Sequence, residues 1–99
     1  MIVAFSDERL ARLFEYGEGA QRYSETIVRA FLRRTRALQA ATDERTLQAL
    51  QSLRLEPTRD RRHRGRYSLR LEDRWRLVVE ISGEGDGKTV TILEISSGD

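Results

Sequence analysis

Hydrophobic residues recur at helical spacing through the first half of the chain. A short apolar, β-branched run first predicts an opening strand over residues 2–5. Behind it, three apolar residues lie on one face of a helix (Leu10, Leu13 and Phe14). Ser6 offers a side-chain oxygen that can cap the N-terminus of this helix, and Gly17 predicts its end.

A longer helix is predicted from about residue 24 to residue 41. Its apolar residues lie close to one face (Tyr23, Ile27, Phe31 and Leu38), and arginines occupy its other faces (Arg29, Arg33, Arg34 and Arg36). With the first helix it should form a helical hairpin. A third, shorter helix is expected behind a cap at Thr42, with Leu47 and Leu50 turned inward.

After Pro57 the period of the pattern changes from that of a helix to that of a strand. Residues 66–71 alternate, with Tyr67, Leu69 and Leu71 on one face and Arg66, Ser68 and Arg70 on the other. Glu72 and Asp73 predict a turn into a second strand, with Trp75, Leu77, Val79 and Ile81 on its apolar side. Its other side carries Arg74, Arg76, Val78 and Glu80. Such a hairpin brings the arginines at 66, 70, 74 and 76 toward one surface.

The glycine-rich segment 83–87 predicts a second turn, and residues 88–95 predict a last strand. This strand is apolar on both faces, as is typical of a strand in the middle of a sheet. The predicted fold class is therefore α+β, with a short N-terminal strand and two to three helices before an antiparallel three-stranded sheet that packs on the helices. Residues 1–99 are expected to form a single domain.

Composition narrows the classes of function. The chain has no cysteine, which excludes disulfides and thiolate metal sites. No run is long and apolar enough for a signal sequence or a membrane span, so a cytoplasmic protein is expected. The net charge is only +2, but segment 54–76 carries nine arginines and four acids. This concentration favours an anionic partner, although a solvated arginine-rich surface would give the same pattern.

The segment from Gly65 to Leu77 resembles a known signature. It is similar to G-x-(Y/W)-S-(I/L)-R-(I/V)-(N/D)-x-x-W-R-(L/I), which is found in HigB-type members of the RelE/ParE toxin superfamily. Residues 2–14, 38–42 and 53–62 also resemble that family, so the likeness covers nearly the whole chain. It implies a RelE-like fold, ribosome-dependent cleavage of messenger RNA without metal or cofactor, and neutralisation by a HigA-like antitoxin.

The resemblance implies a cationic site on the arginine-bearing strands. Arg70 and Arg76 match the arginines of the signature, and guanidinium groups suit the charge that develops on the phosphorane. Further arginines are expected to hold the RNA backbone (Arg62, Arg64, Arg66 and Arg74).

The acid and base of the reaction depart from the family pattern. Killer-type toxins commonly end in Asp-Tyr-His, and the aligned positions here are Glu94, Ile95 and Ser96. Where some members place a histidine before a proline, this chain has Glu56. His63, the sole histidine, and Glu94 are the remaining acid–base candidates. The simpler interpretations are that His63 is a solvated loop residue and that Glu94 forms an ion pair.

Three functions therefore stay open: an active RNA-cleaving toxin, a catalytically degenerate member that acts by binding the ribosome or DNA gyrase, and a member that has lost toxicity. Tyr67 and Trp75 are expected in the core.

Overall fold

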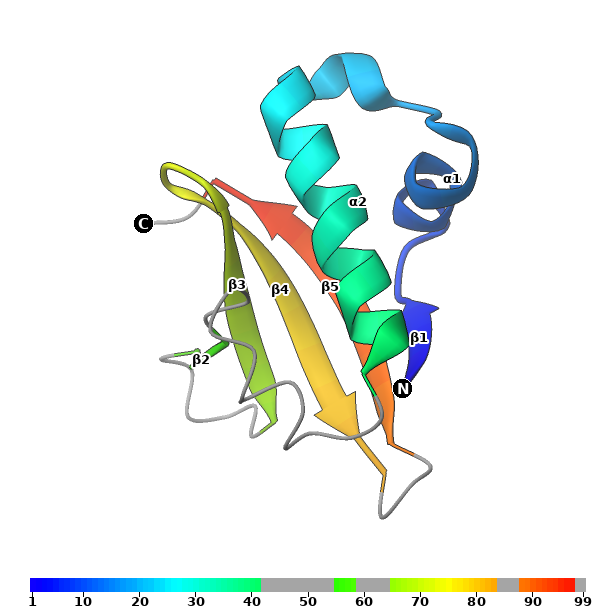
Figure 1. Ribbon diagram of the computed structural model, residues 1–99, viewed down its shortest axis with the longest axis vertical. Coiled ribbons are helices and arrows are strands. Elements are labelled where there is room, and N and C mark those ends of the chain that lie inside the picture. Colours follow the sequence, from blue (N-terminus) through cyan, green and yellow to red (C-terminus); the bar gives the residue numbers. More distant parts are fainter. Residues whose placement is uncertain (42–54, 59–64, 84–87, 98–99) are drawn as a thin grey trace.

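In the part of the chain that the structure describes, two α-helices lie on one side of a sheet. The structure, a computed structural model, describes residues 1–41, 55–58, 65–83 and 88–97. The elements in chain order are β1 (Ile2–Phe5), α1 (Glu8–Tyr16), the short 3-10 helix η1 (Ala20–Arg22), α2 (Glu25–Ala40), β2 (Glu56–Pro57), β3 (Arg66–Glu72), β4 (Trp75–Ser82) and β5 (Thr89–Ser96). In Figure 1, α2 lies across one face of the sheet, and α1 lies above β1. The predicted α+β class is confirmed, and the third helix predicted from Thr42 falls outside the described residues.

The first helix begins one residue later than its sequence predicts. The carboxylate of Asp7, rather than the hydroxyl of Ser6, caps α1 by accepting a hydrogen bond from the backbone N–H of Arg9 at 2.8 Å. Ser6 is still paired with β5, because its backbone N–H donates to Ile92 and its hydroxyl donates to the carbonyl of Leu93. The cap therefore moves to the next residue with a side-chain acceptor.

The second helix agrees with its prediction to within one residue at each end. Ser24 caps α2 by accepting a hydrogen bond from the N–H of Ile27 at 3.2 Å, and the helix ends at Ala40. Its buried face carries Ile27, Ala30, Phe31, Thr35 and Leu38. No helix in the described part of the chain has the length and hydropathy needed to span a membrane.

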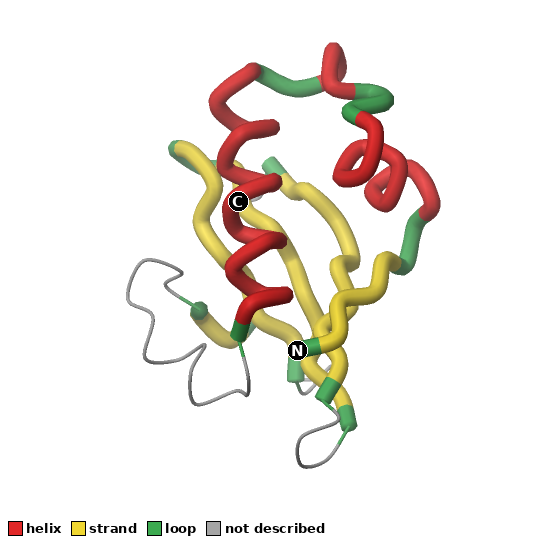
Figure 2. Tube along the Cα trace, turned by 45° about the vertical axis from the view of Figure 1, so that its right-hand side comes forward, coloured by secondary structure: helices red, strands yellow, loops and turns green. Residues whose placement is uncertain are grey.

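Among the described residues, the sheet has five strands in the order β1-β5-β4-β3-β2. The predicted antiparallel pairing of β3, β4 and β5 is confirmed, and β5 lies inside the sheet as its two apolar faces indicate. Two edge strands extend the expected three-stranded sheet: β1 pairs with β5 in parallel, and β2 pairs with β3. Figure 2 shows the same sheet turned, with α2 in front of it.

The β3–β4 turn differs from the prediction. Glu72 remains in β3 and pairs with Trp75, so the turn residues are Asp73, with a φ of 51°, and Arg74. Arg74 therefore lies at the tip of the hairpin and not on the strand face where the alternation placed it.

The core lies between α2 and one face of the sheet. Of the side chains that the structure describes, seven hydrophobic ones are fully buried there: Phe31, Leu38, Leu69, Leu77, Val79, Val90 and Ile92. The ring of Phe31 meets that of Phe14 edge-on, with 6.4 Å between the centroids, which ties α1 to α2. Because strand residues alternate, burial of this face turns the neighbouring residues of β3, β4 and β5 away from the helices.

Candidate functional site

The face of the sheet turned away from α2 collects the charged residues of the strands. On β3, Leu69 and Leu71 are buried while Arg70 between them is exposed, and on β4 Leu77 and Val79 are buried on either side of Val78. The strand register extends this alternation across the sheet. We call the resulting surface the arginine face; its residues are Glu56, Arg66, Ser68, Arg70, Arg76, Val78, Glu80, Glu94 and Ser96.

Arg70 and Arg76 are direct partners across β3 and β4. Side chains at such positions start about 4.5–5.5 Å apart at their Cβ atoms and leave the sheet in the same direction. Like charges in this arrangement repel each other, so the pair is unfavourable in the isolated protein. An anion bound between the two guanidinium groups would remove that repulsion. The geometry therefore fits a site for a phosphate or carboxylate group.

Arg76 is held toward β2 by two side chains. One of its terminal nitrogens lies 3.4 Å from Oε2 of Glu56 and 3.4 Å from the hydroxyl oxygen of Ser68. The side chains of Arg76 and Glu56 are 38% and 61% exposed, so water screens their ion pair. A screened pair of this kind contributes at most about 1 kcal/mol and orients Arg76 without fixing it.

The contact of Glu56 with Arg76 was not predicted from the sequence. It depends on the pairing of Glu56 with Ser68 across β2 and β3. A strand of two residues has no periodicity to reveal it. The sequence signal at this point was limited to the position of Glu56 before Pro57.

Arg66 lies on the same face at the start of β3. It pairs in register with Glu80, and its Nε is buried without a hydrogen-bond partner among the described residues. Arg74 is exposed in the turn, away from the strand positions of Arg70 and Arg76. Of the arginines predicted to hold RNA, Arg66 thus shares the arginine face and Arg74 extends from its end.

Comparison with known proteins identifies the fold. The sequence matches no protein-family model and no curated protein. Among solved structures, it is similar to a YoeB/ParE toxin from Agrobacterium tumefaciens, with a TM-score of 0.62 and 18% identity over 96% of each chain. The chain has the fold of a YoeB/ParE toxin. This finding confirms the expected RelE-like architecture.

In this YoeB/ParE fold, the last strand presents alternate residues to the arginine face. Glu94 pairs with Val78, and Ser96 pairs with Arg76 itself, whereas Ile95 packs against the core. Ser96, which the sequence resemblance aligns with a histidine, is therefore directly opposite Arg76. Glu94 is exposed, and the ion pair expected for it is not formed with any described residue.

Other sequence candidates occupy different parts of the YoeB/ParE fold. Tyr67 and Trp75 pack against the core as expected, and the ring of Trp75 meets that of Tyr23 edge-on at 5.9 Å. His63, Arg62 and Arg64 lie outside the described residues, so their predicted roles stay predictions.

Proposed function

We propose that this chain is the toxin of a type II toxin–antitoxin module, a HigB-like endoribonuclease that cuts messenger RNA on the ribosome in the cytoplasm. The observation that carries the proposal is the direct pairing of Arg70 with Arg76 on the arginine face. The likeness to a YoeB/ParE toxin and the HigB-type signature from Gly65 to Leu77 support it. A HigA-like antitoxin is the partner that such a module requires.

The reaction requires the protein to stabilise negative charge and to transfer protons. The 2′-oxygen of a ribose attacks the neighbouring phosphorus, the bond to the 5′-oxygen breaks, and the products carry a 2′,3′-cyclic phosphate and a 5′-hydroxyl. The pentacovalent phosphorane carries an additional negative charge, which Arg70 and Arg76 would bind between them. Each guanidinium offers several N–H donors in a planar fork that fits phosphate oxygens.

Glu94 is the base that the described residues offer to the 2′-hydroxyl. Its carboxylate is exposed on the arginine face and is not held in an ion pair with the described residues. Ser96, opposite Arg76, can donate a hydrogen bond but is too weak an acid to replace an imidazole. His63 would be the alternative proton donor to the departing 5′-oxygen. The reaction therefore relies mainly on electrostatic stabilisation by the arginines.

A specific observation favours a second function. Because Ser96 stands opposite Arg76 in place of histidine, the arginine face retains its cations and lacks the usual acid–base partner. A face of this kind still binds a phosphate backbone. The chain would then act by occupancy of the ribosome or of DNA gyrase, without cutting RNA.

Induced expression with mapping of messenger RNA 5′ ends tests the proposal. The wild-type chain should arrest growth and produce new 5′ ends within translated messages. Arg70→Ala and Arg76→Ala should lose both effects. Arg33→Ala, which removes an exposed arginine from α2, is the matched control and should retain them.

The outcomes separate the candidate functions. Growth arrest with intact messages would support the binding-only function. Cleavage that survives both Arg70→Ala and Arg76→Ala would place the site elsewhere. Circular dichroism should show that the variants fold, because Arg70 is exposed and the ion pair of Arg76 with Glu56 is screened by water.

A further inference from the structure

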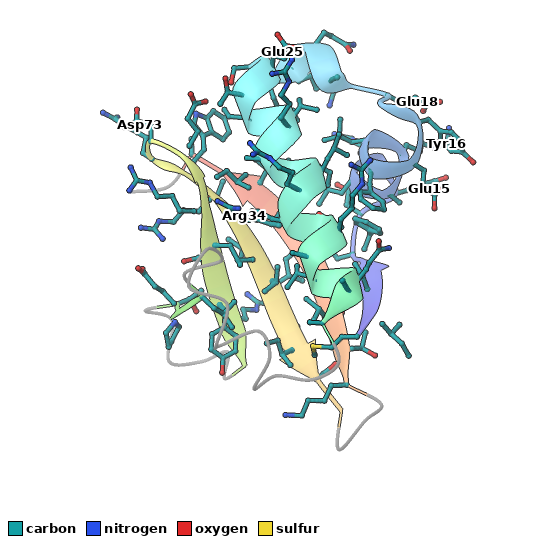
Figure 3. The ribbon with its side chains drawn as sticks, in the orientation of Figure 1. Glu15, Tyr16, Glu18, Glu25, Arg34 and Asp73 are labelled. Atoms are coloured by element: carbon teal, nitrogen blue, oxygen red, sulfur yellow. The ribbon has the colours of Figure 1, made fainter. Side chains whose placement is uncertain are left out.

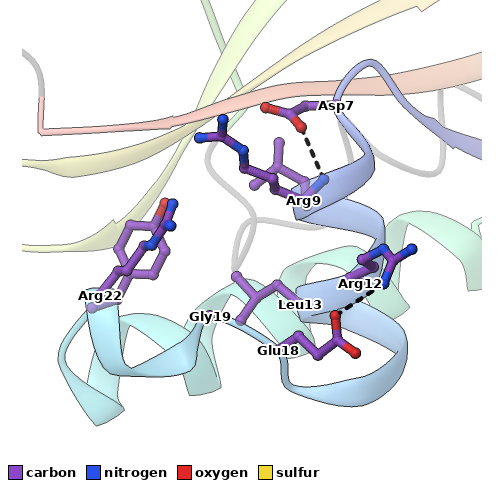
Figure 4. A pocket seen from close by; sticks show the side chains of 9 residues that line it. Asp7, Arg9, Arg12, Leu13, Glu18, Gly19 and Arg22 are labelled. Atoms are coloured by element: carbon purple, nitrogen blue, oxygen red, sulfur yellow. Dashed lines mark hydrogen bonds and ion pairs between the residues drawn. The ribbon is translucent and has the colours of Figure 1, made fainter.

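A pocket of about 300 Å³ opens between α1 and η1, separate from the arginine face. Leu10, Leu13 and Tyr23 contribute its apolar surface. Arginines from two elements line its edge: Arg9 from α1 and Arg22 from η1. Figure 4 shows Arg22 across the pocket from Arg9 and Leu13. The pocket therefore combines an apolar interior with cations on opposite sides.

Some of the charged side chains around this pocket are paired with neighbouring residues, and others have no described partner. Arg12 is bound by Glu8 at 3.0 Å and by Glu18 at 3.3 Å, and these hydrogen bonds raise the pKa of its guanidinium. Asp7 is engaged as the N-cap of α1. The side chains of Arg9 and Arg22, in contrast, form no ion pair or hydrogen bond within the described residues. With respect to the described part of the chain, Arg9 and Arg22 are therefore available to a bound anion, whereas Arg12 is already paired.

We infer that this pocket binds an acidic, amphipathic segment of a protein partner. One large apolar side chain would enter between Leu10 and Leu13, and carboxylates on either side of it would meet Arg9 and Arg22. The volume is at the lower end of the range for ligand pockets, about 300–1,000 Å³, which suits one anchoring side chain. Paired apolar burial and charge contact of this kind is a recurring mode of peptide recognition.

The acids beside the arginines argue against nucleic acid as the occupant. Asp7 and Glu18 also line the pocket. A nucleic-acid backbone carries a charge at every nucleotide and would meet these carboxylates as well as the arginines. A peptide can place separate carboxylates only where the cations are. The inference rests on this pocket alone and does not depend on RNA cleavage at the arginine face.

The test is a titration of the full chain with the peptide acetyl-Glu-Glu-Leu-Phe-Glu-Glu-amide, followed by amide chemical shifts in NMR spectra. We expect shift changes at Leu10, Leu13 and Tyr23 and saturable binding. The double variant Arg9→Gln/Arg22→Gln should raise the dissociation constant at least tenfold. The matched double variant Arg33→Gln/Arg36→Gln removes the same charge from exposed positions of α2 and should leave it within about twofold.

Two further probes make the result specific. A peptide with serine in place of leucine and phenylalanine tests charge alone, and an RNA 12-mer tests nucleic acid. Neither should shift the pocket amides. Equal weakening by the two double variants, equal binding of the serine peptide, RNA-induced shifts in the pocket, or no binding of the acidic peptide would each overturn the inference. Circular dichroism confirms folding of each variant, which is expected because the substituted arginines are exposed.

Discussion

Arg34 on α2 donates a hydrogen bond from Nε to the backbone carbonyl of Arg70, at 3.3 Å. Figure 3 shows its position between α2 and the sheet. The β3–β4 register shifts directly after Arg70, so this donor contacts the backbone where the ladder becomes irregular. Arg34 thus links the helical layer to the strand position that displays Arg70 on the opposite face.

Replacement of Arg34 should loosen this part of β3. Arg34→Met keeps much of the aliphatic chain and removes the donor, so the free energy of unfolding should fall by about 0.5–1.5 kcal/mol. Urea denaturation measures the change. Arg33→Met, at an exposed position without a described side-chain contact, is the control and should change stability by less than about 0.5 kcal/mol. Equal effects of the two variants would show that the hydrogen bond to Arg70 contributes nothing.

The sequence predicted what depends on periodicity. The alternation of Leu69, Arg70 and Leu71 was enough to assign faces to β3, because one face had to be buried. The same alternation predicted that Arg70 and Arg76 share one surface of the hairpin, but their direct pairing depends on the register shift after Arg70, which the alternation does not encode. Arg74 was misplaced because the two-residue turn begins at Asp73 and not at Glu72, and a shift of one residue moves a side chain off its predicted face.

Contacts between distant segments could not be predicted in the same way. Glu56 reaches Arg76 only because β2 adds to the edge of β3, and β1 enters the sheet only by pairing with β5. No local pattern encodes these partners. Glu94, which forms no ion pair with the residues that the structure describes, is a similar case, since whether it meets an arginine depends on side-chain reach across strands rather than on spacing along the chain.

Substitution of Gly65 should destabilise the protein more than substitution of Gly17, a glycine of similar conformation. Its φ is +85°, and an added Cβ would lie 2.9 Å from the backbone oxygen of Ile81, which cannot move without breaking the sheet. Gly17 has a φ of +73° with open space around it. Gly17→Ala should therefore cost about 1 kcal/mol through its left-handed backbone, and Gly65→Ala at least about 1 kcal/mol more. Thermal and urea unfolding of the two variants would show the difference, and equal losses would contradict the close approach to Ile81.

Removal of the Glu56 carboxylate should strengthen RNA binding. In Glu56→Gln, Arg76 loses its partly neutralising partner and is free to reach a phosphate, so affinity for a single-stranded RNA 12-mer should rise several-fold at low ionic strength. Stability should change by less than about 1 kcal/mol. Glu25→Gln breaks the exposed pair with Arg29 on α2 and makes the same change of net charge. Fluorescence anisotropy at several salt concentrations compares them, and an equal gain in both would assign the effect to net charge alone.

A substitution of Glu94 should separate the cleavage of RNA from its binding. If its carboxylate accepts the proton of the 2′-hydroxyl, Glu94→Gln should lower the rate of message cleavage by about 10²-fold or more while RNA affinity is retained. Glu80→Gln, on the same face at β4, is the matched control and should cleave at close to the wild-type rate. The measurement is the yield of new 5′ ends on ribosome-bound messages over time. Equal rates for wild type and Glu94→Gln would remove Glu94 from the reaction.

Ser96 offers a gain-of-function experiment. Its register partner is Arg76, so Ser96→His would place an imidazole directly across from the arginine. An imidazole titrates near neutral pH and can supply a proton to the departing 5′-oxygen, which serine cannot do efficiently. We expect message cleavage to increase by about tenfold or more, with a pH profile that differs from that of the wild-type chain because the new imidazole titrates. Thr91→His, a substitution on β5 at the register partner of Glu80, serves as the control and should not accelerate cleavage. If Ser96→His binds RNA and folds normally yet cleaves no faster, the arginine face is a binding surface and the occupancy function is favoured over the nuclease.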